Sequence, residues 1–233
     1  MKTHKMDLVY VCRPGDNEEL RYSIRSVEAN LKHGKIWVVG YRPDWYSGNF
    51  ISVEDTSSKF NNIINCLKVV VDTEDVAEDF IFMNDDFFLL KQLDSIPIYH
   101  GGPLLDKVEK YMSIISNSYA RLLQRTYLEL IASGIPDPLD YDIHVPMSMT
   151  KSGLKKALTK AYFPRSAYGN IMNVGGELTR DVKSYQKGSY LSSNSYDFEN
   201  GSLPFVSTED GSFRDVYNAL LKDMFPNPSK YEV

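Results

Sequence analysis

The first hundred positions alternate between short continuous apolar runs and stretches in which apolar residues recur three or four positions apart. The short runs predict strands, whereas the helical spacing over 20–31 and 60–71 predicts two helices that each bury one face. The strands are expected at residues 8–12, 36–39, 51–53 and 80–83. A β-α-β-α-β order of this kind predicts a mostly parallel sheet flanked by helices.

The apolar run at 80–83 has no polar position on either of its alternating faces. Such a run is typical of a central strand that is covered on both sides.

Polar residues indicate where the helices begin. Asp16 suits the N-cap of the first helix, with Glu19 as its capping-box partner, and the second helix is expected to begin near Ser57 or Ser58.

The second half of the chain is less regular and is expected to complete the same domain. Its expected elements are a helical stretch at 104–133 broken near 116–118, a short helix at 150–161, short strands and loops at 169–204, and a last helix at 213–224. No internal repeat or low-complexity linker divides the chain. The pattern therefore predicts one compact α/β domain over residues 1–233.

Composition and charge narrow the class of protein. Hydrophobic residues make up 42% of the chain and charged residues 24%, which is typical of a globular protein rather than a disordered one. The net charge is -5 and no long Lys/Arg run is present. Tight binding to duplex nucleic acid is therefore not favoured, although a small basic groove assembled in three dimensions stays open.

Cys12 and Cys66 lie far apart, one at the end of an apolar strand and one inside an amphipathic helix. Both are expected to be buried free thiols rather than a disulfide.

The sequence shows no signal peptide and no apolar run long enough to cross a bilayer, so we expect a cytoplasmic location and no membrane partner. It also has no P-loop, no Gly-x-Gly-x-x-Gly motif and no Gly-x-Ser-x-Gly elbow.

The sharpest chemical signal is Asn84-Asp85-Asp86, directly after the expected central strand. Ligands of open α/β sheets bind beyond the carboxyl ends of the strands, and paired carboxylates there suit Mg²⁺ or Mn²⁺ holding a diphosphate. The competing interpretation is that these acids only cap the next turn or are solvated. The apolar segment at 87–90 favours a functional role, because unpaired charge between buried segments is unfavourable.

Two further segments carry candidate residues. His144 stands between two apolar β-branched residues and suits proton transfer, although a lone histidine more often has a structural role. Arg165, at a predicted helix start, suits phosphate binding. Asp181 suits a metal ligand and Lys183 a point charge, whereas each taken alone is more typical of a surface ion pair. Arg13, after the first strand, is a candidate contact for base or phosphate.

These segments, in this order, resemble the Stealth family, whose members transfer sugar-1-phosphate from nucleotide sugars and are related to GT-A glycosyltransferases. Residues 19–28 and 82–88 resemble the second conserved region of that family. The other matching segments are 7–10 for the first region, 144–146 for the third, and 165–166 with 181–183 for the fourth. The likeness extends over roughly residues 7–183.

The resemblance implies a GT-A-like, Rossmann-like fold and a role for each matched residue. Asp85 and Asp86 would bind the metal and diphosphate, and His144 would be the acid/base residue. Arg165 and Asp181 would complete the phosphate and metal site. Two departures are visible: the Trp-Val-Asn/Asp-Gly segment expected after the first strand is absent, and residues 213–232 match no motif of the family.

Together these observations predict a metal-assisted transferase with a nucleotide-diphosphate sugar, UDP- or GDP-linked, as its donor. Residues 1–100 would form the donor and metal half, and residues 101–233 the acceptor half. The acceptor hydroxyl is left open among a glycan, a protein and a hydroxymethylated base, as is the choice between glycosyl and sugar-phosphate transfer. The alternatives are a non-catalytic glycan- or nucleotide-binding module and an assembly protein with a vestigial site.

Overall fold

The computed structural model describes all residues except 1–4, 57, 115–117, 160–162, 188–189 and 192–202. Its main sheet has the strand order β3-β2-β1-β4-β7. These strands are β1 (Asp7–Cys12), β2 (Ile36–Gly40), β3 (Asn49–Ser52), β4 (Asp79–Asn84) and β7 (Met147–Thr150). All neighbours pair in parallel except β7, which runs antiparallel to β4. The prediction of a mostly parallel α/β sheet is confirmed.

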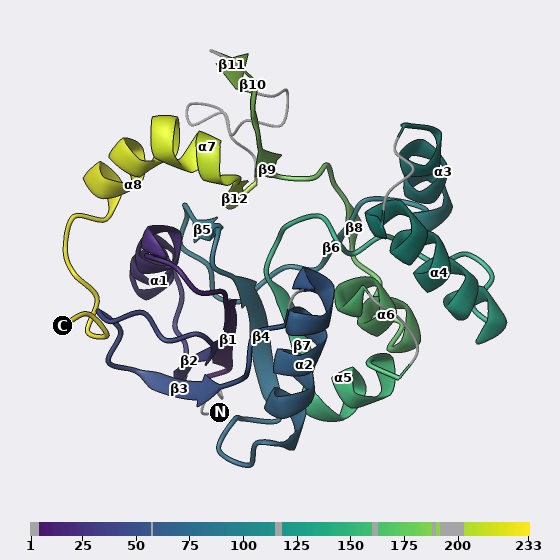
Figure 1. Ribbon diagram of the computed structural model, residues 1–233, viewed down its shortest axis with the longest axis horizontal. Coiled ribbons are helices and arrows are strands. Elements are labelled where there is room, and N and C mark those ends of the chain that lie inside the picture. Colours follow the sequence, from purple (N-terminus) through teal and green to yellow (C-terminus); the bar gives the residue numbers. More distant parts are fainter. Residues whose placement is uncertain (1–4, 57, 115–117, 160–162, 188–189, 192–202) are drawn as a thin grey trace.

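Helices cover both faces of this sheet (Figure 1). They are α1 (Glu18–Asn30) on one face, and α2 (Lys59–Asp72), α5 (Lys151–Ala157) and α6 (Pro164–Ile171) on the other. Ile81 and Met83 of β4 pack in the core cluster on the α1 side, and Phe80 and Phe82 in the cluster on the α2 side. The apolar alternation of β4 therefore arises from burial on both faces, as the sequence predicts.

A small second sheet lies beyond the ends of β1 and β4 (Figure 1). It has the order β5-β12-β9 and consists of β5 (Phe87–Leu89), β12 (Phe205–Thr208) and β9 (Lys183–Ser184). The last helical segment follows as α7 (Asp210–Ser212), η1 (Phe213–Tyr217) and α8 (Asn218–Met224). It packs on Tyr22 of α1 and Phe88 of β5. This arrangement brings residues from the end of the chain to the carboxyl ends of the central strands.

The remaining elements lie at the sides of the domain. They are α3 (Leu104–Ile114), α4 (Ser118–Ala132), the pair β6 (Tyr99–His100) and β8 (Glu177–Leu178), and the pair β10 (Gln186–Lys187) and β11 (Tyr190–Leu191). Helices α3 and α4 flank the predicted break, of which 116–117 lie outside the described residues. None of the helices in the described part of the chain has the length and apolar character that crossing a membrane would need.

Two local predictions agree with the structure, and two others differ from it in where an element begins. Cys12 and Cys66 are buried and free, as expected. Ser58 caps α2 by accepting a hydrogen bond from the main chain of Asn61, also as expected. The third strand begins two residues earlier than predicted, at Asn49, and the region predicted as loops and strands from 169 begins inside α6.

The predicted cap of the first helix is wrong. The N-cap position of α1 is occupied by Asn17, in a left-handed conformation with φ 52°, and no side chain caps the helix there. The Asn17 amide instead donates to the main-chain oxygens of Arg13 and Gly15. This local turn competes with the Asp16 cap, and it leaves the Glu19 carboxylate free to face the strand ends.

The C-terminal residues are fastened to α1 by Glu232, whose side chain is 5% exposed and pairs with Arg21 and Arg25. Burial alone would raise the pKa of Glu232, but hydrogen bonds from Arg25 and Ser229 lower it to about 2. Because this pKa is lower in the folded state, the stabilisation is complete above the ordinary glutamate pKa and is lost as pH falls towards about 2.

We therefore expect Glu232→Gln to lower the free energy of unfolding at pH 7 by about 3 kcal/mol. The difference from the wild-type protein should shrink as pH falls from 5 to 2, since both proteins then lack the charge at this position. Denaturant unfolding at a series of pH values measures it. An equal difference at pH 7 and at low pH would show that the Glu232 charge contributes nothing.

Candidate functional site

The candidate site lies where the parallel strands β1 and β4 end. Asn84 is the last residue of β4, and Asp85 and Asp86 form the turn into β5. Strands β9 and β12 lie beyond this turn (Figure 1). The edge at which parallel strands end is the usual ligand-binding edge of an open α/β sheet.

Asp86 is the most deeply buried acid of the site, at 6% exposure. Its Oδ2 accepts hydrogen bonds from Lys183 Nζ at 2.6 Å and from Ser207 Oγ at 2.9 Å. Burial acts to raise the pKa of Asp86, but Lys183 and His144 outweigh it and hold that pKa below its usual value. The second oxygen, Oδ1, is buried and has no hydrogen-bond partner. A charged carboxylate with one free oxygen is therefore held in place here.

Two further carboxyl groups lie close to Asp86. Burial, followed by the charge of Asp86, raises the pKa of Asp85 to about 6. Burial, followed by Asp86 and Asp85, raises the pKa of Glu19 to about 7, although the Thr208 hydroxyl donates to Glu19 at 2.9 Å. Asp86 is ionised, whereas Asp85 and Glu19 beside it resist ionisation, so this region favours a neighbouring positive charge.

Glu19 was not predicted as a site residue, because its spacing from Asp16 is typical of a capping box. The available signal was its position. Glu19 lies in the first turn of the helix that follows β1, and it belongs to the segment 19–28 that resembles a Stealth region. A side chain in that turn faces the carboxyl end of the sheet.

For Glu19 we expect a pH-dependent effect on stability in protein freed of divalent ions. The folded state keeps a proton on Glu19 up to about pH 7, whereas the unfolded chain releases it near the ordinary glutamate pKa, so stability falls as pH rises between these values. Glu19→Gln should therefore raise Tm at pH 8 and have little effect at pH 5. The matched control is Glu18→Gln, an exposed neighbour in the same turn. Equal shifts for Glu19→Gln at the two pH values would contradict the assignment.

His144 and Asp181 form a pair at the edge of the site. His144 Nδ1 lies 3.0 and 2.9 Å from the two carboxylate oxygens of Asp181. Burial acts to raise the pKa of Asp181, but its contact with His144 outweighs burial and lowers it. Because an ionised carboxylate only accepts hydrogen bonds, Nδ1 carries the proton and donates it, and in the neutral ring Nε2 keeps its lone pair.

The backbone of His144 is in the left-handed region, with φ 54°. This conformation costs an L-residue about 1 kcal/mol or more. Its neighbours Ile143 and Val145 are both buried, at 2% and 3% exposure, whereas His144 is half-buried. The turn thus buries the flanking apolar side chains and directs the imidazole towards Asp181.

Arg165 is buried at the start of α6, at 7% exposure. Its guanidinium carbon lies 4.1 Å from the ring centre of Phe82 and 5.1 Å from that of Phe87. One terminal nitrogen donates to Asn84 Oδ1 at 2.8 Å, and Nε is buried without a partner. Burial lowers the pKa of Arg165 to about 10, while Asp142 and Asp86 act in the opposite direction. Arg165 thus places a fixed positive charge behind the acids.

The predicted site residues meet in one network. Asp86 interacts electrostatically with His144 and Arg165, and directly with Lys183. Arg13 interacts with Asp85, although its exposed guanidinium pairs with Asp210 at 2.8 Å. The residues brought together are Arg13, Asp85, Asp86, His144, Arg165, Asp181 and Lys183. Their chemical roles stay predictions.

A metal ion fits two of the predicted ligands, Asp85 and Asp86, better than the full predicted set that includes Asp181. In the described part of the chain, no group of three or more His, Cys, Asp or Glu side chains is arranged to hold a metal ion. Both oxygens of Asp181 lie within hydrogen-bond distance of His144 Nδ1, and its role as a metal ligand stays a prediction. Mg²⁺ commonly takes one or two carboxylates and completes its shell with phosphate oxygens and water. Asp85 and the free Oδ1 of Asp86 fit this smaller set.

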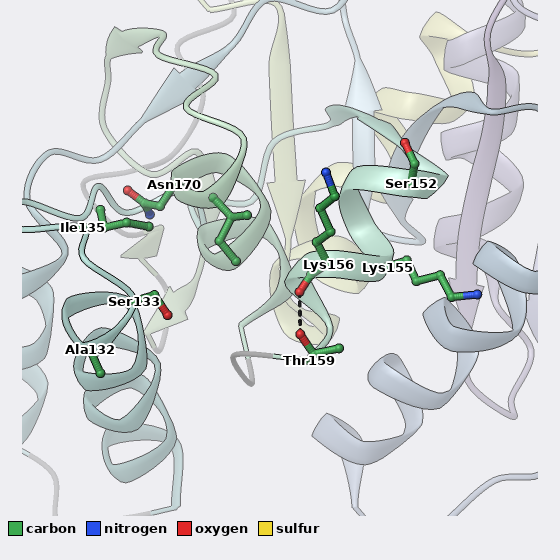
Figure 2. Close-up of a pocket in the computed structure, with 9 residues that line it drawn as sticks. Ala132, Ser133, Ile135, Ser152, Lys155, Lys156, Thr159 and Asn170 are labelled. Carbon is green, nitrogen blue, oxygen red and sulfur yellow. Dashed lines mark hydrogen bonds between the residues drawn. The ribbon is translucent and has the colours of Figure 1, made fainter.

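A cavity of about 880 Å³ lies elsewhere, between α4, α5 and α6 (Figure 2). None of the predicted site residues lines it. The Lys155 and Lys156 side chains diverge rather than point at one another, and Lys155 pairs with Asp72 at 2.7 Å. Asn170 is occupied by the main chain of Leu139. Among the described residues that line it, the cavity therefore shows no converging set of free polar groups.

Comparison with known proteins leaves the family open. No family model matches the sequence. No curated protein matches it either. Among solved structures, a 4-diphosphocytidyl-2C-methyl-D-erythritol synthase is similar, with a TM-score of 0.42 and 11% sequence identity, over 93% of this chain and 99% of that one. Similarity at this level carries no argument about what the chain does, so the candidate function must rest on the residues of the site.

Proposed function

We propose that this protein is a metal-assisted transferase that moves a glycosyl or sugar-phosphate group from a nucleotide-diphosphate sugar to an acceptor hydroxyl. The observation that carries the proposal is the meeting of Asp85, Asp86, Lys183 and the His144–Asp181 pair beyond the ends of β1 and β4. The set combines oxygen ligands for a divalent ion, positive charge for phosphate and a group that can accept a proton.

The donor diphosphate would bind over the acids. Asp85 and the free Oδ1 of Asp86 would hold Mg²⁺ or Mn²⁺, which would offset the negative charge that develops on the leaving nucleotide. Lys183 holds Asp86 in place and adds positive charge beside the phosphates. Arg13 is largely exposed, so its guanidinium can exchange Asp210 for a phosphate oxygen or the base.

The acceptor would be activated by His144. Asp181 keeps the proton on Nδ1, so Nε2 can accept the proton of the acceptor hydroxyl while its oxygen attacks. Attack on the sugar-bearing phosphorus forms the new phosphodiester and breaks the bond to a nucleoside monophosphate. Attack on the anomeric carbon instead releases the nucleoside diphosphate. The resemblance to the Stealth family favours phosphorus.

The two halves of the chain would divide this work. Residues 1–100 contribute Arg13 and the paired aspartates, and residues 101–233 contribute His144, Arg165 and Lys183. UDP- or GDP-sugars are the proposed donors, and the acceptor is a glycan, a protein or a hydroxymethylated base. The net charge of -5 makes duplex nucleic acid the least favoured acceptor. A cytoplasmic location is part of the same proposal.

The test is consumption of a nucleotide sugar in the absence of any acceptor. The protein is incubated with UDP- and GDP-sugars and Mn²⁺, and the released nucleotide is identified by chromatography. Slow release that stops when EDTA is added is expected, with water in place of the acceptor. A monophosphate product indicates attack at phosphorus, and a diphosphate indicates attack at carbon. Binding without turnover would instead support a non-catalytic binding module, and neither binding nor turnover would refute the proposal.

A further inference from the structure

One half-buried lysine of α3, Lys107, reaches the turn that carries His144. Lys107 Nζ donates to both carboxylate oxygens of Asp140, at 3.1 and 2.8 Å, and to the main-chain oxygen of Asp142, at 2.7 Å. The Lys107 side chain is 14% exposed and that of Asp140 is 5% exposed. Because Asp142 stands two residues before His144, these bonds fix the backbone next to the histidine.

The same turn is enclosed by two glycines. A Cβ at Gly101 would lie 2.9 Å from Ile143 and 3.0 Å from the Asp140 carboxylate, and a Cβ at Gly169 would lie 2.4 Å from the Tyr141 ring. The main chains of Gly101 and Asp140 are also hydrogen-bonded, at 2.7 Å. A side chain at either glycine would displace side chains of the turn, so the turn is packed against both neighbours.

The Asp142 carboxylate connects this turn to α6. Its Oδ2 accepts from the Ser166 hydroxyl at 2.6 Å and from the Ser166 main chain at 3.3 Å. Arg165, the preceding residue, interacts electrostatically with both Asp142 and Asp86. Lys107 is therefore linked, through the turn 140–144 and Ser166, to Arg165, whose positive charge acts on Asp86.

His144 needs such support, because its left-handed backbone is a strained conformation. Strained residues persist where their surroundings determine the backbone from several sides. We propose that Lys107 is a positioning residue: it ties α3 to the turn 140–144 and thereby holds the His144 imidazole against Asp181. The proposal rests on the function proposed above for His144. It adds a residue that touches neither the substrate nor the metal.

The test variant is Lys107→Met, which keeps most of the side-chain volume and removes the three donors. The His144 ring signal in a heteronuclear NMR spectrum should move or broaden, and it can be assigned among the four histidines by its loss in His144→Gln. Turnover should fall about 10- to 100-fold, while KM for the nucleotide sugar stays within about twofold. A purely structural lysine would lower Tm without moving the His144 signal.

A second variant covers the case in which Lys107→Met does not fold, since it leaves the Asp140 charge buried and unpaired. Lys107→Met with Asp140→Asn removes both charges and keeps an acceptor for the main-chain N–H of Asp142. It should fold and still show the displaced His144 signal. The matched control is Lys110→Met, an exposed lysine on the same helix, which should change neither readout.

The outcomes separate the two proposals. A folded double variant with an unchanged His144 signal and unchanged turnover would overturn the role of Lys107. A double variant that fails to fold would assign Lys107 and Asp140 to stability and would equally overturn it. Absence of nucleotide-sugar turnover in the wild-type protein would refute the proposed function, whereas the His144 signal would still decide whether Lys107 positions that ring.

Discussion

Asp86→Asn is expected to reduce turnover of a nucleotide sugar by about 10³-fold while leaving the fold intact. The substitution keeps a hydrogen-bond acceptor for Ser207 but removes the charge that faces Lys183 and the free oxygen Oδ1. Without that charge, the divalent ion loses one of its two carboxylates. Initial rates at saturating Mn²⁺ measure the loss, and circular dichroism checks the fold.

A matched control lies at the opposite end of the same strand. Asp79→Asn changes the same residue type at an exposed position, where β4 begins. It should leave turnover within about twofold, in line with other exposed surface substitutions. Full activity of the Asp86→Asn protein would remove Asp86 from the metal and diphosphate assignment. An equal loss in the Asp79→Asn protein would show that the effect is not specific to the site.

The second large effect is expected at the histidine pair. His144→Gln should reduce turnover by about 10²- to 10⁴-fold, because glutamine cannot take the proton of the acceptor hydroxyl. Asp181→Asn should reduce turnover through the same step, since a neutral amide no longer fixes the Nδ1 proton. The double variant should lose no more than His144→Gln alone, because residues that act as a unit are not additive.

Measurements of kcat together with donor affinity by titration calorimetry test this pair. Donor affinity should change little in all three proteins, because the pair is proposed to act on the acceptor. His33→Gln is the control, since His33 bonds only to the main chain of its neighbour Gly34 among the contacts of the described residues. Multiplicative losses in the double variant would show that His144 and Asp181 act in separate steps.

The main sheet could be predicted because its signals are local. The apolar run at 80–83 and the helical spacing over 20–31 each reflect burial within one element. The β5-β12-β9 sheet could not, because β12 pairs with β5 across more than a hundred residues and its four residues carry no distinctive pattern. Asp16 failed as a cap because the Asn17 side chain forms a competing local turn.

In the candidate site, too, the local features could be predicted from the sequence and the long-range contacts could not. Asp85 and Asp86 stood out because two adjacent acids follow a buried strand, which needs no knowledge of the rest of the fold. Their partners depend on the tertiary structure. The contact of Lys183 with Asp86 exists only because β9 pairs with β12 beside the acids. Asp181 was predicted as a metal ligand from its residue type and from the resemblance, and only the fold shows that both its oxygens face His144.

The proposed metal-dependent donor site can be tested most directly by a thermal-shift screen of nucleotide sugars with and without Mn²⁺. A ligand at about 100 times its Kd stabilises the folded state by about 2.7 kcal/mol, which for a domain of this size raises Tm by roughly 5–10 °C. A UDP- or GDP-sugar should give such a shift only when Mn²⁺ is present, and the shift should be lost in Asp86→Asn. A shift that is independent of Mn²⁺ and equal in the variant, or no shift with any nucleotide sugar, would contradict the proposed donor site.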